Sequence, residues 1–182
     1  LETYMSQVRR IPLLTRDEEQ ALAERWAKDA DVEAAHKLVT GNLRFVVKVA
    51  MEYRSYGMRV LDLIQEGNVG LMHAVRKFDP TRGYRLITYA VWWIRAYIQS
   101  YLVRAWSMVK MGTTQAQRKL FFKLRSAEKE MRLLHGHALD DMGDEERTEH
   151  LAEMLGVRPK DVSQMKMRMS GRDFSLDVTL DD

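Results

Sequence analysis

The sequence predicts an all-α protein, on two observations. Apolar residues recur at the three- and four-residue spacing of a helix, as in Leu43, Val46, Val47 and Ala50, whereas strand-like alternation is hard to find. Only three of the 182 residues are proline, so few positions interrupt a helix. With 46% hydrophobic and 30% charged residues, the chain has an ordinary globular composition. Its length allows one or two small domains with their own cores.

Composition excludes several classes of protein. The chain contains no run of eighteen apolar residues, so we expect no transmembrane helix and no membrane contact. The first residues do not resemble a signal peptide. Cysteine is absent, which excludes disulfides and thiolate metal sites. These features agree with a reducing compartment, and we expect a cytoplasmic protein.

The first forty residues predict three helices. A short helix over residues 1–8 is followed by an extended apolar connector over residues 11–14. Thr15 and Glu18 have the spacing of a capping box, in which each side chain binds the backbone of the other, and they begin the second helix. Asp31 is the expected N-cap of the third helix. Gly41 and the asparagine after it are expected to break or bend the chain.

Two further helices are expected between residues 43 and 78, separated by Gly57. In the second of them, Gly67 and Gly70 lower helix stability, which indicates close packing against another backbone. Asp62 and Glu66 are like charges one turn apart, so they form either a solvated pair or a surface that meets a basic partner. The expected core residues of this helix are Leu61, Ile64, Leu71, Ala74, Val75 and Phe78.

Residues 79–83 predict a turn, because proline fixes φ and glycine admits a positive φ. The turn leads into a helix over residues 84–106 that is rich in aromatic and basic residues. At 100° per residue, one side of this helix is the expected core stripe and the opposite side mixes aromatic, polar and cationic residues. The stripe consists of Ile87, Val91, Ile94, Ile98 and Tyr101; the opposite side carries Thr88, Trp92, Arg95 and Gln99, with Tyr89, Trp93 and Ala96 beside them.

Two interpretations of this aromatic helix remain open from its own residues. Trp92 and Trp93 are adjacent, so they cannot both lie in one core stripe. A face of Trp, Tyr, Thr, Arg and Gln suits base stacking combined with phosphate contacts. The alternative is a core helix whose tryptophan pair fills space.

The second part of the chain predicts a connector over residues 107–114 and a helix over residues 115–134, capped by Thr114. A polar loop follows over residues 136–143. Two short helices over 144–155 and 159–169, joined by a glycine turn, resemble a helix-turn-helix, an arrangement that also occurs as a simple packing unit. The acidic tail, residues 171–182, shows no helical pattern.

Charge is unevenly distributed along the chain. Between Arg76 and Arg125 we count eleven Lys or Arg residues and one acid, whereas from Ser126 onward there are fourteen acids and eight bases. A basic segment that coincides with the aromatic helix indicates polyanion binding rather than a solvated face alone.

The sequence gives no positive sign of an enzyme, and we expect no catalytic residue, cofactor or metal. It contains no phosphate-binding loop, nucleophile elbow or HExxH motif. His135 and His137 could hold a metal weakly, but they more simply read as surface histidines.

Three segments together resemble region 2 of the sigma-70 family of bacterial transcription initiation factors, with matching order and spacing across about sixty residues. They are NLRFVVKVAMEYRSYG (42–57), DLIQEGNVGLMHAVRKFDPTRG (62–83) and TYAVWWIRAYI (88–98). QRKLFFKLR (117–125) is similar to the signature box of the heat-shock subgroup. The resemblance implies regions 1.2 and 2 over 1–106, region 3 over 107–170 and the start of the acidic region 3.2 finger over 171–182. The chain ends without region 4, so we expect it to be truncated.

The resemblance implies a promoter-specificity factor, for heat-shock or stress genes, that binds core RNA polymerase. The implied partner is the clamp helices of the largest polymerase subunit. The residues implied on that surface are Asp62, Leu63, Gln65, Glu66, Asn68 and Leu71. Chaperones and a protease are implied regulators. The alternative is a helical regulatory adaptor whose tryptophan helix binds protein.

The resemblance also implies recognition and melting of the minus-10 promoter element, mainly through the non-template strand. Tyr89 would stack on a flipped base, while Trp92 and Trp93 would wedge against the duplex. Met5 and Ser6 match positions that contact the discriminator. Leu86 stands where many members have Phe, so one aromatic of the melting set is missing. The implied DNA-contacting residues are Lys77, Arg82, Tyr84, Arg85, Thr88, Tyr89, Trp92, Trp93, Arg95, Ala96 and Gln99, of which Ala96 and Gln99 depart from the housekeeping pattern.

Overall fold

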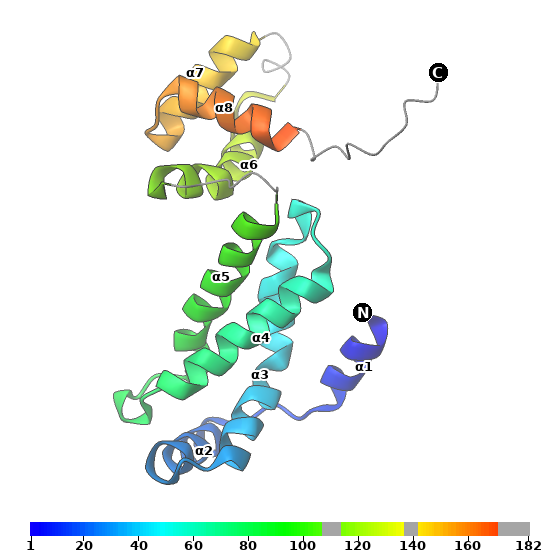
Figure 1. Ribbon diagram of the computed structural model, residues 1–182, viewed down its shortest axis with the longest axis vertical. Helices are drawn as coiled ribbons and strands as arrows, with labels where there is room; N and C mark the ends of the chain where they lie inside the picture. Colours follow the sequence, from blue (N-terminus) through cyan, green and yellow to red (C-terminus); the bar gives the residue numbers. More distant parts are fainter. Residues whose placement is uncertain (107–113, 137–141, 171–182) are drawn as a thin grey trace. The chain divides into compact units, whose positions relative to one another are not determined.

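The computed structural model describes residues 1–106, 114–136 and 142–170, and these ranges contain helices and no strand (Figure 1). The all-α prediction is confirmed. The chain divides into two compact units, Leu1–Leu102 and Val103–Asp182. The long helices are α1 (Glu2–Arg10), α2 (Arg16–Asp29), α3 (Val32–Glu52), α4 (Val60–Lys77), α5 (Leu86–Ala105), α6 (Gln115–His135), α7 (Asp144–Leu155) and α8 (Pro159–Ser170), with short 3₁₀ turns η1 (Arg54–Tyr56) and η2 (Pro80–Arg82).

The predicted caps at the starts of α2 and α3 are confirmed. The Thr15 N–H donates to Glu18 Oε2 (2.8 Å), and the Glu18 N–H donates to Thr15 Oγ1 (3.3 Å). Asp31 Oδ1 accepts hydrogen bonds from the N–H groups of Glu33 and Ala34, at 2.9 and 3.2 Å. Each cap satisfies N–H groups that have no partner within the helix, so these short-range signals fix where the helices begin.

The expected break at Gly41 and Asn42 is wrong, because α3 runs through both residues. Asn42 is buried and its Nδ2 donates to the Leu38 carbonyl at 2.8 Å, so its amide is satisfied within the helix. A Cβ at Gly41 would lie 2.8 Å from the side chain of Leu14. The glycine therefore admits the connector that precedes α2 rather than bending α3.

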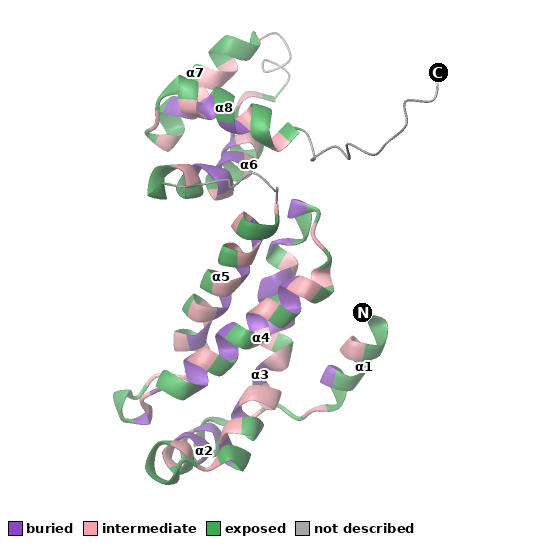
Figure 2. Cartoon of the chain, in the orientation of Figure 1, coloured by how far each residue is buried: buried purple, intermediate pink, exposed green. Residues whose placement is uncertain are grey.

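The core of the first unit lies among α3, α4 and α5, as the burial pattern shows (Figure 2). The expected stripe of α5 is only partly correct: Ile94 and Ile98 are buried, but Ile87, Val91 and Tyr101 are half-buried. Leu61, expected in the core of α4, is 39% exposed. The observed stripe of α5 is Leu86, Ala90, Ile94, Ile98 and Leu102, a strict four-residue repeat.

The close packing against another backbone predicted from Gly67 and Gly70 is confirmed at Gly70, whereas the close neighbours of Gly67 are side chains. A Cβ at Gly70 would lie 2.7 Å from the carbonyl oxygen of Trp93 and 2.9 Å from the Cα of Ile94. A Cβ at Gly67 would lie 2.6 Å from Val46 Cγ1. Glycine thus lets α4 approach the backbone of α5, which brings the aromatic face of α5 beside the end of α4.

The second unit is built on α6, α7 and α8. Thr114 begins α6 with a capping box completed by Gln117, and Gly156 ends α7 with a φ of 64° in the left-handed region that favours glycine. The buried residues of the second unit include Leu120, Phe121, Leu124, Leu151, Val162 and Met165. The connector over 107–113, most of the polar loop (137–141) and the acidic tail (171–182) lie outside the described residues.

Candidate nucleic-acid and polymerase interface

A row of rings runs along the junction of α4 and α5. We call it the aromatic row, and its neighbouring ring centroids lie 4.1 to 6.4 Å apart. Such spacings are those of favourable aromatic packing. Because four of its members come from the turn before α5 and from α5, the row follows the helix singled out from the sequence. Its members are Phe78, Tyr84, Tyr89, Trp93, His73 and Tyr97.

The two adjacent tryptophans have different surroundings. Trp92 is 71% exposed. Trp93 is half-buried, its ring centroid 4.1 Å from that of His73, and Lys77 Nζ lies 5.2 Å from the Trp93 centroid. The prediction that the two side chains cannot share the core stripe is confirmed. Trp92 is free to meet another molecule, whereas Trp93 is held within the aromatic row.

Cations border the aromatic row. Lys77 is exposed at the end of α4. Arg82 is exposed, and its Nε donates to Asp79 Oδ2 at 3.2 Å. Asp79 also accepts from the hydroxyl and the N–H of Thr81, and these bonds, with Arg82, hold the pKa of the Asp79 carboxyl below its usual range. The turn before α5 is therefore stiffened by one carboxylate.

Arg85, expected to contact phosphate, is directed into the first unit instead. Its Nε and Nη2 donate to the two carboxylate oxygens of Glu19, at 2.9 and 3.0 Å. Glu19 is only 3% exposed, and its Oε1 also accepts from the Leu86 N–H at 2.9 Å. A buried carboxylate needs such compensation. Arg85 therefore acts within the fold, and we leave it out of the candidate interface.

Leu86 does not belong to the candidate melting face either. Its side chain is completely buried, in the core stripe of α5. A leucine at this position therefore supports the core of the first unit.

The remaining implied DNA residues lie further along α5. Thr88 and Ala96 are exposed. Arg95 Nη2 donates to Glu52 Oε2 at 3.1 Å, a pair in which both side chains stay substantially exposed. Gln99 Nε2 donates to the Tyr53 hydroxyl at 2.9 Å, and burial raises the pKa of that hydroxyl. These contacts hold the far part of the face to the end of α3.

The surface expected to bind polymerase needs two corrections. Leu63 and Leu71 are completely or almost completely buried, so their side chains belong to the core. Gln65 is exposed, and Glu66 is half-buried. Asn68 Nδ2 lies 3.3 Å from both Gln65 Oε1 and the Tyr4 hydroxyl.

Asp62 has a basic partner at the N-cap of its own helix. Arg59 Nε donates to Asp62 Oδ2 at 2.9 Å, and the Tyr101 hydroxyl donates to the same oxygen at 3.4 Å. The pair that Asp62 forms with Glu66 therefore does not by itself require an outside cation.

Sequence reasoning missed an apolar strip on the outer side of α4. Leu61, Val69 and Met72 are 39%, 43% and 46% exposed, with the exposed Gln65 between them in sequence. Their helical spacing, on a side of α4 next to the one that buries Ile64 and Leu71, was the available signal. We call Leu61, Gln65, Val69 and Met72 the α4 strip. Exposed apolar side chains in a row mark a surface for protein contact.

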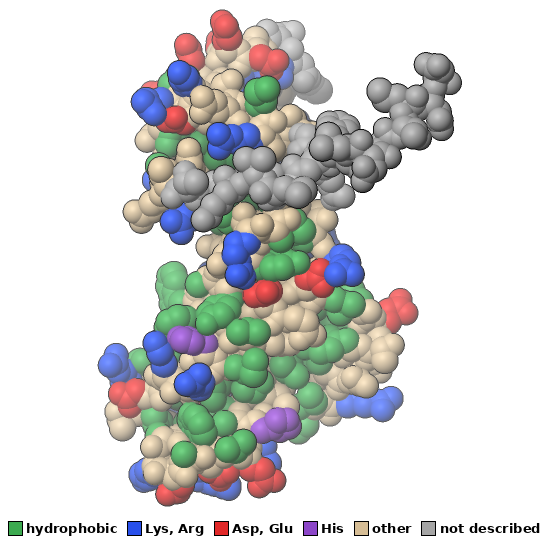
Figure 3. Space-filling model, in the orientation of Figure 1, with side chains coloured by type: hydrophobic (Ala, Val, Ile, Leu, Met, Phe, Trp, Pro, Cys, Tyr) green, Lys and Arg blue, Asp and Glu red, His purple; other side chains and the backbone are tan. Residues whose placement is uncertain are grey.

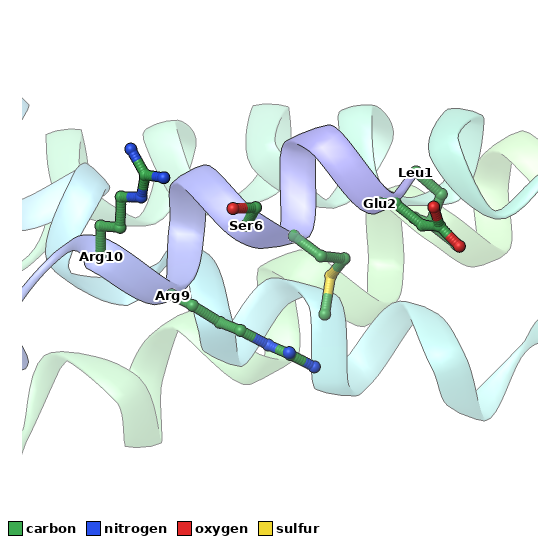
Figure 4. A pocket seen from close by; sticks show the side chains of 6 residues that line it. Leu1, Glu2, Ser6, Arg9 and Arg10 are labelled. Carbon is green, nitrogen blue, oxygen red and sulfur yellow. The ribbon is translucent and has the colours of Figure 1, made fainter.

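Met5 and Ser6, the implied discriminator residues, lie on α1. They line a hollow along this helix together with Leu1, Glu2, Arg9 and Arg10 (Figure 4). Ser6, Arg9 and Arg10 are exposed. On the molecular surface, hydrophobic side chains gather over the first unit with basic side chains among them (Figure 3).

Within the residues that the structure describes, no group of three or more His, Cys, Asp or Glu is placed to hold a metal. Among the same residues, none of the helices combines the length and hydropathy that crossing a bilayer requires.

Two family profiles match the stretches of the chain that make up most of the first unit. The profile of Sigma-70 region 2 matches residues 38–108, and that of Sigma-70 factor, region 1.2 matches residues 1–30. Together they cover the aromatic row, the α4 strip and α1. This chain belongs to the sigma-70 family.

Relatives in this family extend the similarity over nearly the whole chain. The RNA polymerase sigma-C factor of Myxococcus xanthus is 52% identical over 99% of the chain and 59% of its own length. The RNA polymerase sigma factor RpoH of Caulobacter vibrioides is 49% identical over 99% of the chain and 60% of its length. The RNA polymerase sigma-B factor of Myxococcus xanthus is 56% identical over 79% of the chain and 56% of its length. The chain thus spans about 60% of the length of the relatives it matches.

Proposed function

We propose that this chain provides the polymerase-binding and promoter-melting parts of a sigma-70 family factor. It binds core RNA polymerase and recognises the minus-10 element, mainly through the non-template strand. The observation that carries the proposal is the exposed Trp92 beside the aromatic row, with Lys77 and Arg82 at its edge. Stacking rings bordered by cations are what single-stranded nucleic acid requires of a protein surface.

Stacking of bases on the aromatic face can offset the free-energy cost of keeping a few base pairs open. Unstacking a base from a duplex costs a few kcal/mol. Base–aromatic stacking returns about 1–3 kcal/mol per base. Trp92 and the exposed part of Trp93 act at the edge of the duplex, and Tyr89 stacks on a flipped base. Lys77, Arg82 and Arg95 supply phosphate contacts and hence salt dependence.

Base choice in the minus-10 element depends on the residues that border this face. Tyr84, Thr88, Ala96 and Gln99 lie on the turn before α5 or on α5, and Thr88 and Ala96 are exposed. Similarity to a sigma factor named RpoH, together with the QRKLFFKLR segment, supports promoters of heat-shock or stress genes. Met5 and Ser6 contact the discriminator, the bases just downstream of the minus-10 element.

Polymerase binding is assigned to the α4 strip with its polar neighbours Asp62, Glu66 and Asn68. An apolar strip rimmed by polar groups suits a specific protein interface. The clamp helices of the largest polymerase subunit are the proposed partner. Chaperones and a protease are proposed as regulators, and no described residue favours a helical adaptor.

The test is promoter opening by holoenzyme that carries the double variant Trp92→Ala, Trp93→Ala. On duplex promoter we expect a loss of open complexes of at least about tenfold, the worth of one stacking contact. On the same promoter with its minus-10 bases already unpaired, most of the loss should disappear, because the unstacking cost is no longer incurred. Val32→Ala, which removes an exposed apolar side chain from α3, is the matched control. Unchanged opening of duplex promoter by the double variant would show that melting does not depend on this face.

A further inference from the structure

Helix α1 has little apolar contact to hold it. It is nine residues long, and Val8 is its only buried residue. Isolated helices of this length are marginal in water, since nucleation and ordering cost more than their few hydrogen bonds return. The place of α1 on the first unit must therefore depend on specific anchors.

Arg44, an exposed residue of α3, supplies such an anchor. Its Nε donates to the Val8 carbonyl at 3.2 Å, and its Nη2 donates to the carbonyls of Arg9 and Ile11, the latter at 2.9 Å. These carbonyls belong to the end of α1, where the helix dipole is negative and most backbone oxygens lack helical partners. The Val8 carbonyl also accepts from the Ile11 N–H at 3.3 Å. A guanidinium satisfies several of them at once because its donors are fixed in a planar fork.

A second, weaker contact holds the other half of α1. The Tyr4 hydroxyl lies 3.3 Å from Asn68 Nδ2 on α4. Two polar contacts, to α3 and α4, thus fix the direction of a helix that buries a single side chain.

We propose that Arg44 is a positioning residue for DNA contact by α1. By binding the terminal carbonyls of α1, it holds Met5 and Ser6 at a fixed place relative to the aromatic row on α5. The exposed Arg9 and Arg10 are presented by the same anchor toward the phosphates of the strand. This inference rests on the proposed function, because α1 needs a fixed place only if the discriminator is read there.

The structural half is tested on the whole chain by amide hydrogen exchange in residues 2–10. Arg44→Ala should speed exchange in α1 by about tenfold or more, as expected when a charged donor to several carbonyls is lost. Arg44→Lys should restore little, because an ammonium cannot reproduce the fork. Lys48→Ala removes an exposed cation one turn further along α3 and should leave α1 unchanged. Unchanged protection of α1 in Arg44→Ala overturns the inference.

The functional half compares open-complex lifetimes on two promoters that differ only in the discriminator. The ratio of lifetimes should fall toward one in Arg44→Ala holoenzyme and stay at the wild-type value in Lys48→Ala. Binding to core polymerase and melting of the minus-10 element should be retained in both. A loosened α1 with an unchanged ratio overturns the inference, and so does a wild-type holoenzyme that melts promoters but ignores the discriminator. A wild-type holoenzyme that melts no promoter overturns the proposed function itself, while the exchange experiment still reports on the anchor.

Discussion

Glu19 and Arg85 form a two-pronged ion pair across 66 positions of the sequence, with N–O distances of 2.9 and 3.0 Å. The same carboxylate accepts the N–H of Leu86, the first residue of α5. A negative charge at a helix N-terminus is favoured by the helix dipole. Helix α2 thereby caps the helix that carries the aromatic row, so region 1.2 and region 2 fold as one unit.

We predict that Glu19→Gln lowers the free energy of unfolding by about 2 kcal/mol. Breaking a buried ion pair costs about 3–5 kcal/mol, and the value is reduced because the Arg85 side chain is 41% exposed. Urea unfolding of the chain measures the change. Asp17→Asn, at an exposed position in the same first turn of α2, should cost only a few tenths of a kcal/mol. Equal effects of the two variants would mean that the pair contributes nothing of its own.

Most helix boundaries could be predicted because their signals are local. Thr15, Asp31 and Thr114 each bind backbone groups two or three positions away, so a short window contains the whole interaction. The aromatic content and basic charge around α5 were equally visible. These local features are sufficient to predict the fold class and the helix on which the candidate site lies.

What could not be predicted depends on partners far away in the sequence. Arg85 looks like a phosphate ligand until Glu19 is placed beside it, and Leu86 enters the core because the same carboxylate fixes the start of α5. Leu63 and Leu71 lie within a family motif, but packing inside the first unit decides which members of that motif reach the surface. The position of a motif therefore identifies the segment that forms an interface, and burial decides which side chains of that segment can contact a partner.

Gly70→Ala should destabilise the first unit although alanine is the better helix former. A Cβ would meet backbone atoms of Trp93 and Ile94 at 2.7 and 2.9 Å, which cannot rotate away. Overpacking of this kind costs about 1–3 kcal/mol, against a gain of up to about 1 kcal/mol in helix propensity. Thermal unfolding should show a lower Tm. Gly143→Ala, where nothing lies within 4 Å of the new Cβ, is the control and should leave the unfolding of the first unit unchanged, because Gly143 belongs to the second unit. A Tm for Gly70→Ala at or above the wild-type value would contradict the close approach of α4 and α5.

Alanine substitutions of the two tryptophans should differ in their effect on the stability of the chain. Trp92→Ala should change the free energy of unfolding by less than about 0.5 kcal/mol, because a 71% exposed side chain loses few contacts. Trp93→Ala should cost about 2 kcal/mol, since it removes a ring packed on His73 and Tyr89. Chemical denaturation of the single variants makes the comparison. A larger loss of stability in Trp92→Ala than in Trp93→Ala would contradict the assignment of Trp92 to the surface and of Trp93 to the aromatic row.

Acid should selectively weaken the turn before α5. The pKa of Asp79 is lowered in the folded chain from its ordinary value of 3.8, chiefly by the hydrogen bond from the Thr81 hydroxyl. A lowered folded pKa means that the stabilisation is present above the unfolded value and is lost as pH falls through the folded value. We predict that Asp79→Asn is less stable than the wild type at neutral pH. The difference should shrink as the pH is lowered from neutral into the acid range, because the carboxyl group is progressively protonated. Urea midpoints measured along this pH series give the result, and a difference independent of pH would exclude the carboxylate as its source.

The α4 strip gives a prediction that separates polymerase binding from folding. Met72→Glu places a charge at the C-terminal end of the α4 strip, where a partner would have to desolvate it. We expect co-purification with core RNA polymerase to fall by at least about tenfold, the cost of one unpaired buried polar group. Stability should change by less than about 0.5 kcal/mol, because Met72 is already 46% exposed. Val32→Glu puts the same charge on an exposed apolar position of α3 and should leave co-purification intact. Retention of Met72→Glu at the wild-type level would place the polymerase contact away from the strip. Loss of both variants would point instead to a general effect of added negative charge.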